Sequence, residues 1–146
     1  MAKKKYAREG RYFAFHEEIL SSNAYRDLDC VSRCLLVEFV RVCFPLERNG
    51  RLSISTANAA ARLNIHRDTA AKAFYQLTEH GFIILRKGEF WQQRQARKWA
   101  LTILPEGKRR EPADDWKQWK LGSPVFEIPT RKKTVRQDAT DESNVG

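Results

Sequence analysis

Apolar residues recur at helical spacing between Asp29 and Pro45, where they form the widest apolar stripe of the chain. Asp29 is a suitable N-cap, so we predict that this stretch is the main core helix. Ahead of it, we expect residues 12–15 to form a short strand and residues 16–28 to form one or two short helical turns. The apolar stripe of the core helix consists of Val31, Cys34, Leu35, Leu36, Val37, Phe39, Val40, Cys43 and Phe44.

Two more helices are predicted, with a short turn between them. A helix over residues 55–63 begins with a serine cap and is rich in alanine, so a neighbouring helix can approach it closely. Asn64 follows at the place where a left-handed residue commonly ends a helix. The next helix begins at His66 or Arg67 and ends at Gly81.

Short strands are predicted from alternating apolar and polar residues. Residues 52–54 alternate after a turn signal at residues 47–50. Residues 82–85 and 99–103 are the strands of a hairpin whose tip is basic and rich in glutamine. The order helix, short strand, helix, turn, helix, strand, basic hairpin, strand is that of a winged helix-turn-helix. We therefore predict a mainly helical α+β fold of this type, with a three-stranded antiparallel sheet and the basic hairpin as its wing.

The composition fits one domain, and the charge is unevenly placed. The chain has 146 residues, of which 42% are apolar, and a formal net charge of +9. Residues 1–11 and residues 65–104 carry +4 each, and this clustering is typical of a surface that binds a polyanion. We expect four parts: a mobile basic arm (residues 1–11), the winged helix-turn-helix domain (12–104), a tryptophan-containing extension packed on it (105–123) and a disordered polar tail (124–146).

The third predicted helix fits the major groove of B-DNA, with its N-terminal end toward the bases. There, Arg67 can donate two hydrogen bonds to a guanine, and Thr69 can contact a thymine methyl or a phosphate. Asp68 either complements the helix dipole or reads a cytosine, and Lys72 is a fourth candidate for base contacts. Apolar Ile65 is expected to anchor the turn from inside. Further candidates on the helix are Gln76 and His80, and the predicted backbone and wing contacts are Ser55, Thr56, Asn58, Arg86, Lys87, Gln92, Gln93, Arg94, Arg97 and Lys98, together with Lys3, Lys4 and Lys5 of the arm.

The sequence argues against a disulfide framework, a metal site and catalysis. Its three cysteines, Cys30, Cys34 and Cys43, lie close together without a CxxC spacing, so we expect reduced, mostly buried thiols. The histidines show no paired ligand spacing, and the chain has no nucleophilic triad, carboxylate pair or glycine-rich phosphate loop. We therefore expect no enzymatic activity, cofactor or metal. Because there is no long apolar run and no signal-like start, we expect a cytoplasmic protein that does not bind membranes.

Four segments carry a family resemblance: residues 55–63 (STANAAARL), 64–65 (NI), 67–71 (RDTAA) and 77–83 (LTEHGFI). They resemble small winged helix-turn-helix proteins of bacterial prophages, plasmids and integrative elements, and the likeness extends between Phe13 and Trp119. The resemblance implies sequence-specific DNA binding on the bacterial nucleoid, either as a transcriptional regulator or in replication control like plasmid initiator domains. The sequence departs from the family at His66, where serine or threonine is expected as the helix cap.

Three functions remain open at this point. The chain binds double-stranded DNA, or it binds RNA or single strands through Phe90, Trp91 and Trp99, or it is a protein-interaction module. Trp116 and Trp119 share one face of a short helix or turn. They either fold back as added core or form an exposed patch for a partner protein or a second copy of the chain. A monomer and a dimer on paired half-sites both suit such a domain.

Overall fold

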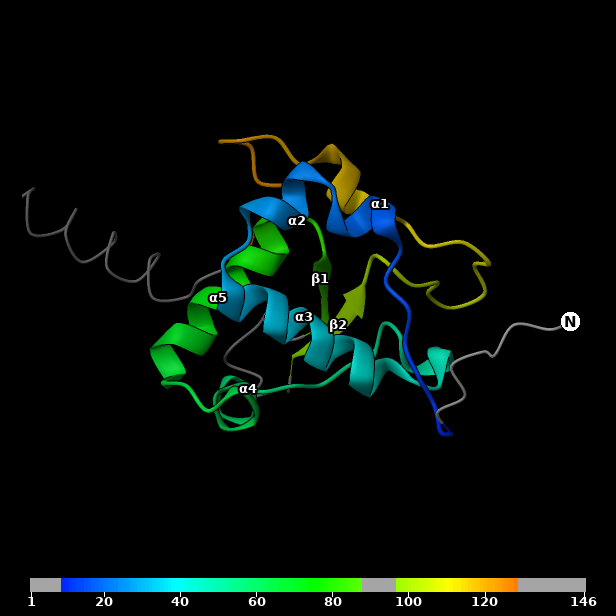
Figure 1. Ribbon diagram of the computed structural model, residues 1–146, viewed down its shortest axis with the longest axis horizontal. Coiled ribbons are helices and arrows are strands. Elements are labelled where there is room, and N and C mark those ends of the chain that lie inside the picture. The colour runs from blue at the N-terminus through cyan, green and yellow to red at the C-terminus, as the bar shows by residue number, and fades with distance from the viewer. Residues whose placement is uncertain (1–8, 88–96, 129–146) are drawn as a thin grey trace, which may run out of the picture.

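The structure is a computed structural model that describes residues 9–87 and 97–128. Its elements in chain order are α1 (Glu17–Leu20), α2 (Asn23–Asp27), α3 (Cys30–Cys43), η1 (Leu46–Arg48), α4 (Thr56–Leu63), α5 (Arg67–Glu79), β1 (Ile83–Lys87), β2 (Lys98–Leu101) and η3 (Asp115–Gln118). They form a mainly helical α+β fold, in which α3 passes across the sheet and packs against both α4 and α5 (Figure 1).

α3 supplies the centre of the core. It begins as predicted, because the carboxylate of Asp29 accepts a hydrogen bond from the amide of Ser32 at 2.8 Å. Its buried residues are Ser32, Leu35, Leu36, Phe39, Val40 and Cys43. The predicted stripe is too wide, since Cys34 and Val37 are exposed. A helix that packs on one side buries a stripe only slightly wider than about 100°, and these two positions lie outside it.

The three cysteines differ in exposure. Cys43 is buried, whereas Cys30 and Cys34 are exposed, so the prediction of mostly buried thiols is wrong. Cys30 and Cys34 lie one turn apart on α3, on the side of the helix that the core does not cover. All three are free thiols, and burial raises the pKa of Cys43 from 9.0 to about 11.

α4 and α5 meet across the predicted turn. The Ser55 hydroxyl accepts a hydrogen bond from the amide of Asn58, and Asn64 ends α4 in the left-handed conformation with φ 56°. Ile65 is half-buried against the core, as expected for an anchor of the turn. The buried alanines of the two helices are Ala59, Ala60, Ala70 and Ala73. These small side chains allow the two backbones to approach closely, and the predicted cap and turn are confirmed.

β1 and β2 pair in an antiparallel sheet. Leu52 adds a single antiparallel bridge to Trp99, with N···O distances of 3.0 and 2.8 Å. In place of the predicted three-stranded sheet, the described residues therefore contain a two-stranded sheet to which Leu52 adds one bridge. Gly50 turns the chain with φ 98° just before the bridge and α4 is capped at Ser55 just after it, so the segment between them is only residues 51–54.

The N-terminal segment also differs from its prediction. No strand occurs at residues 12–15, and no backbone hydrogen bond ties residues 9–15 to another described segment. Instead, Phe13 packs on Phe44 with ring centroids 4.8 Å apart. Side-chain contacts thus hold this segment without a backbone ladder. α1 and α2 confirm the short helical turns predicted for residues 16–28.

The chain after β2 returns to the end of the molecule formed by α1 and α2 (Figure 1). There, Trp116 is 5% exposed and stacks on Phe82, with ring centroids 6.2 Å apart. Gly81 permits this close packing, because its φ is 83° and a Cβ would lie 3.0 Å from the backbone of Asp115. The packing continues into the predicted tail, since Ile128 is buried too. Val125 and Phe126 beside it are half-buried, so the short apolar stretch 125–128 packs on the domain and residues 124–128 do not form the expected disordered start of the tail.

Candidate nucleic-acid interface

The N-terminal end of α5 presents polar side chains to solvent. Arg67, Asp68, Thr69 and Lys72 are all exposed, and the buried side of the helix packs against α3 and α4. α5 begins at Arg67 because His66 caps it, with its Nδ1 accepting a hydrogen bond from the amide of Asp68 at 3.1 Å. Among the described residues, neither Arg67 nor Lys72 has a carboxylate within 4 Å. The structure thus brings the four predicted base-reading residues together on one exposed helix end.

Asp68 is the acidic member of this group. Its side chain is 89% exposed, and its Oδ2 lies 3.7 Å from Nδ1 of His66. A carboxylate in the first turn of a helix is favoured by the helix dipole. The same position is open to solvent, so the dipole role and a base contact are both compatible with the geometry.

The α4 residues of the predicted interface differ in availability. The hydroxyl oxygen of Ser55 accepts the capping hydrogen bond from the amide of Asn58 at 3.0 Å. The hydroxyl proton of Ser55 can still be donated to a ligand. Thr56 is half-buried and the Asn58 side chain is exposed. Ser55 and Asn58 therefore keep donors that could reach a phosphate.

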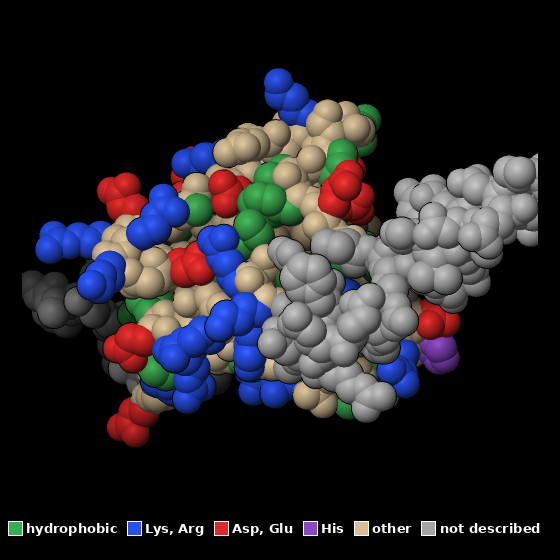
Figure 2. All heavy atoms as spheres, turned by 180° about the vertical axis from the view of Figure 1, so that it is seen from behind, with side chains coloured by type: hydrophobic (Ala, Val, Ile, Leu, Met, Phe, Trp, Pro, Cys, Tyr) green, Lys and Arg blue, Asp and Glu red, His purple; other side chains and the backbone are tan. Residues whose placement is uncertain are grey.

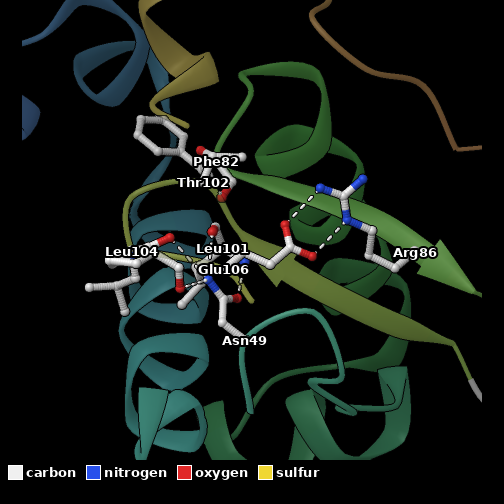
Figure 3. A network of polar contacts seen from close by, with 8 residues as sticks. Asn49, Phe82, Arg86, Leu101, Thr102, Leu104 and Glu106 are labelled. Carbon is white, nitrogen blue, oxygen red and sulfur yellow. Dashed lines mark hydrogen bonds and ion pairs between the residues drawn. The ribbon is translucent and has the colours of Figure 1, made fainter. Parts of the chain in front are cut away.

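Arg86 is neutralised by an ion pair. Its Nε and Nη2 donate to the two carboxylate oxygens of Glu106 at 2.9 and 2.7 Å (Figure 3). These hydrogen bonds raise the pKa of Arg86. Gly50 leaves space for the carboxylate, since a Cβ there would lie 2.6 Å from Oε2 of Glu106.

The other predicted arm and wing residues Lys3, Lys4, Lys5, Gln92, Gln93 and Arg94, and the aromatic residues Phe90 and Trp91, lie outside the described residues.

A hollow of about 510 Å³ is lined by four cationic side chains, those of Arg48, Arg51, Lys87 and Lys98. Lys87 and Lys98 are directly opposite each other in the sheet, and Arg97 beside them is exposed. No described carboxylate lies within 4 Å of any of the four. Seen from behind, the molecule carries a group of adjacent Lys and Arg side chains in its lower half (Figure 2). The sequence did not lead us to assign Arg48 and Arg51 to the interface. Their position on either side of an Asn-Gly turn was the signal from which they could have been identified.

Gln76 and His80 have structural contacts. Oε1 of Gln76 accepts a hydrogen bond from the amide of Asp29 at 2.8 Å. His80 is 7% exposed, and its ring nitrogens lie 2.7 Å from the carbonyl oxygen of Gln76 and from Oδ2 of Asp27. Its ring also stacks on Trp119, with centroids 4.7 Å apart. His80 therefore lies inside the fold and half-buried Gln76 is engaged at the start of α3, so neither belongs to the exposed N-terminal end of α5.

Neither a metal cluster nor a membrane helix occurs in the described part of the chain. No three or more His, Cys, Asp or Glu side chains there are grouped so that they could hold a metal ion. None of the helices in residues 9–87 and 97–128 combines the length and the apolar character needed to cross a bilayer.

Comparisons with known proteins gave no match. No protein-family model matches the chain, and no curated protein or solved structure is significantly similar to it. Its function must therefore be inferred from its own residues and their arrangement.

Proposed function

We propose that this chain is a sequence-specific double-stranded DNA-binding protein, acting as a transcriptional regulator or replication-control factor of a mobile genetic element. In this proposal the domain is a winged helix-turn-helix. α5 lies in the major groove, α4 crosses the backbone, and the hairpin of β1 and β2 contacts the backbone or the minor groove. The bridge at Leu52 corresponds to the third strand of that architecture.

The observation that carries the proposal is the geometry of the α4–α5 pair. α4 is capped at its start and ends at left-handed Asn64, and α5 begins after only two more residues. α3 and α4 cover the buried side of α5, which leaves its first turns exposed. A helix about 10–12 Å in diameter fits a major groove about 12 Å wide. The exposed end of α5 is thus shaped to enter the groove.

The chemistry of that helix end supports base reading. Arg67 can donate two parallel hydrogen bonds to a guanine edge, and Thr69 can contact a thymine methyl group. Lys72 lies further along the exposed side of α5, where it can contact a phosphate. Because no described carboxylate neutralises Arg67 or Lys72, their charges are available to DNA.

The alternatives draw less support from the described residues. Trp99 is 1% exposed and packed in the core, so it has no free face on which a base could stack. Trp116 is buried on Phe82, and Trp119 is half-buried on His80. These two tryptophans therefore do not form the exposed aromatic patch that a protein-interaction module would need.

Selection from a random-sequence duplex pool at two salt concentrations tests the proposal. We expect an enriched motif whose binding survives the higher salt, because base contacts depend less on counterion release than phosphate contacts do. Arg67→Ala should lower discrimination at one base position by about 5- to 150-fold, the range for one bidentate contact.

The matched control is Arg41→Ala, which removes an exposed arginine of α3 that pairs with Glu38. This variant should keep the wild-type motif. The proposal fails if no motif is enriched, or if Arg67→Ala and Thr69→Ala both select the same motif as the native chain.

A further inference from the structure

We propose that Arg48, Arg51, Lys87 and Lys98 form a binding site for a phosphate group of a nucleic-acid backbone. This inference rests on the proposed function and extends it. The interface then includes the turn at residues 46–51 as well as α5 and the hairpin. No sequence pattern assigned that turn to binding.

The first argument is electrostatic. Like charges directly opposite each other in a sheet destabilise it, and Lys87 and Lys98 are such a pair. Arg48 and Arg51 add two more cations around the same hollow. Nearby Arg86, by contrast, is matched by Glu106 at 2.7 Å. A cluster of cations without a described counter-charge gains stability when an anion enters, so the arrangement favours an anionic ligand.

The second argument is that the turn is held in place. Asn49 is 4% exposed, and its Nδ2 donates to the carbonyl oxygens of Leu101, Leu104 and Pro105 at 2.9, 3.0 and 3.0 Å (Figure 3). Its Oδ1 accepts a hydrogen bond from the amide of Leu101 at 2.7 Å. Arg48 precedes this anchored residue and Arg51 follows it closely. Their backbone positions are therefore fixed relative to β2, which lowers the ordering cost of binding.

The third argument is the chemistry of the donors. Guanidinium groups bind phosphate oxygens through paired hydrogen bonds, and lysine ammonium groups bind them as point charges. Nη2 of Arg51 donates a hydrogen bond to the carbonyl oxygen of Glu47 at 3.1 Å, which orients the guanidinium group. The other N–H donors of this group remain for a ligand. Lys87 and Lys98 belong to the proposed wing, so the hollow adjoins the path of a bound backbone. This continuity favours a nucleic-acid phosphate over a free ion.

The test measures how duplex binding by the full chain depends on salt. Each phosphate contact contributes about −0.9 to the slope of log K against log salt concentration. We expect Arg48→Gln/Arg51→Gln to make the slope shallower by about 1 to 2 with a random-sequence duplex. The control is Arg26→Gln/Lys120→Gln, which removes two exposed charges at α2 and in the C-terminal extension. It should keep the native slope, and thermal unfolding should show both variants folded.

The outcomes separate this site from the proposed function. Equal slopes for the two double variants overturn the phosphate site, whatever motif is selected. A shallower slope for Arg48→Gln/Arg51→Gln supports the site, even if no motif is enriched and sequence-specific binding fails. A second arm adds inorganic phosphate at constant ionic strength. If phosphate raises the Tm of the native chain but not of Arg48→Gln/Arg51→Gln, while the duplex slopes stay equal, the hollow takes a free ion and the backbone assignment is overturned.

Discussion

At the scale of single residues, Asn49 shows how one side chain can join distant parts of the chain. Its amide group satisfies three carbonyl oxygens and one amide in the segment 101–105. A leucine of similar size would leave these groups without that partner, and each buried unsatisfied group costs about 1–3 kcal/mol. An aspartate would place its charge against the carbonyl oxygens. The position therefore requires an amide, which donates on one side and accepts on the other.

Cys43 gives a prediction at the same scale, on pH and stability. Burial raises the pKa of its thiol from 9.0 to about 11, so folding favours the neutral thiol. Its contribution to the free energy of unfolding is full below pH 9 and is lost as the pH rises toward 11. The loss amounts to about 3 kcal/mol. Urea unfolding of the native chain and of Cys43→Ala, measured from pH 8 to pH 11, checks this.

The comparison of the native chain with Cys43→Ala is internally controlled, because both chains contain the same exposed cysteines, tyrosines and lysines. Cys43→Ala should be less stable than the native chain at pH 8, where it leaves a cavity. The difference should shrink as the pH rises. A difference that stays constant across the range contradicts the prediction.

At the scale of elements, the helix ends of the α4–α5 pair were more predictable than the strands. Ser55 and Asn64 are typical residues for their cap positions, and a local pattern is enough to recognise them. His66 also acts as a cap, although it lies outside the usual set of cap residues. A strand instead needs a hydrogen-bonded partner strand. Residues 12–15 have the apolar pattern of a strand, but they do not pair with the edge of the described sheet. The single bridge at Leu52 depends on the same long-range pairing.

Asn64 gives a prediction at this scale. Its left-handed φ of 56° costs about 1–2 kcal/mol for most L-residues, whereas glycine and, in part, asparagine tolerate it. We expect Asn64→Ala to lower the free energy of unfolding by about 1 kcal/mol and Asn64→Gly to leave it nearly unchanged. Urea unfolding midpoints at neutral pH check both variants. An alanine variant as stable as the glycine variant would show that the turn does not depend on this conformation.

At the scale of the whole molecule, the segment after β2 contributes Trp116 and Ile128 to the core. Trp116 covers Phe82, and the amide of Val125 donates to the carbonyl oxygen of Glu79 at 2.7 Å. The sequence placed two tryptophans on one face but gave no sign of what they would cover, because their partners lie far away in the chain. The partners of Asn49 and of Arg86 were hidden for the same reason. Charge clustering was visible in the sequence, whereas ion pairing was not.

Trp116 therefore gives the prediction for the whole fold. Trp116→Ala should lower the free energy of unfolding by about 3–5 kcal/mol, because it uncovers Phe82 and leaves a large cavity. Trp119→Ala should cost less, since Trp119 is only half-buried. Both variants should unfold in a single transition in urea when followed by circular dichroism. If neither variant changes the free energy of unfolding, the extension is not part of the cooperative unit.

The ion pair of Arg86 depends on a residue that carries no charge. Gly50 lies so close to Glu106 that any side chain there would displace the carboxylate. The carboxylate would have to shift, and its two hydrogen bonds to Arg86 would take another geometry. A substitution at position 50 would thus alter a charge pair near the cationic hollow without adding or removing an ionisable group. The geometry of this ion pair is therefore set in part by a residue that has no side chain.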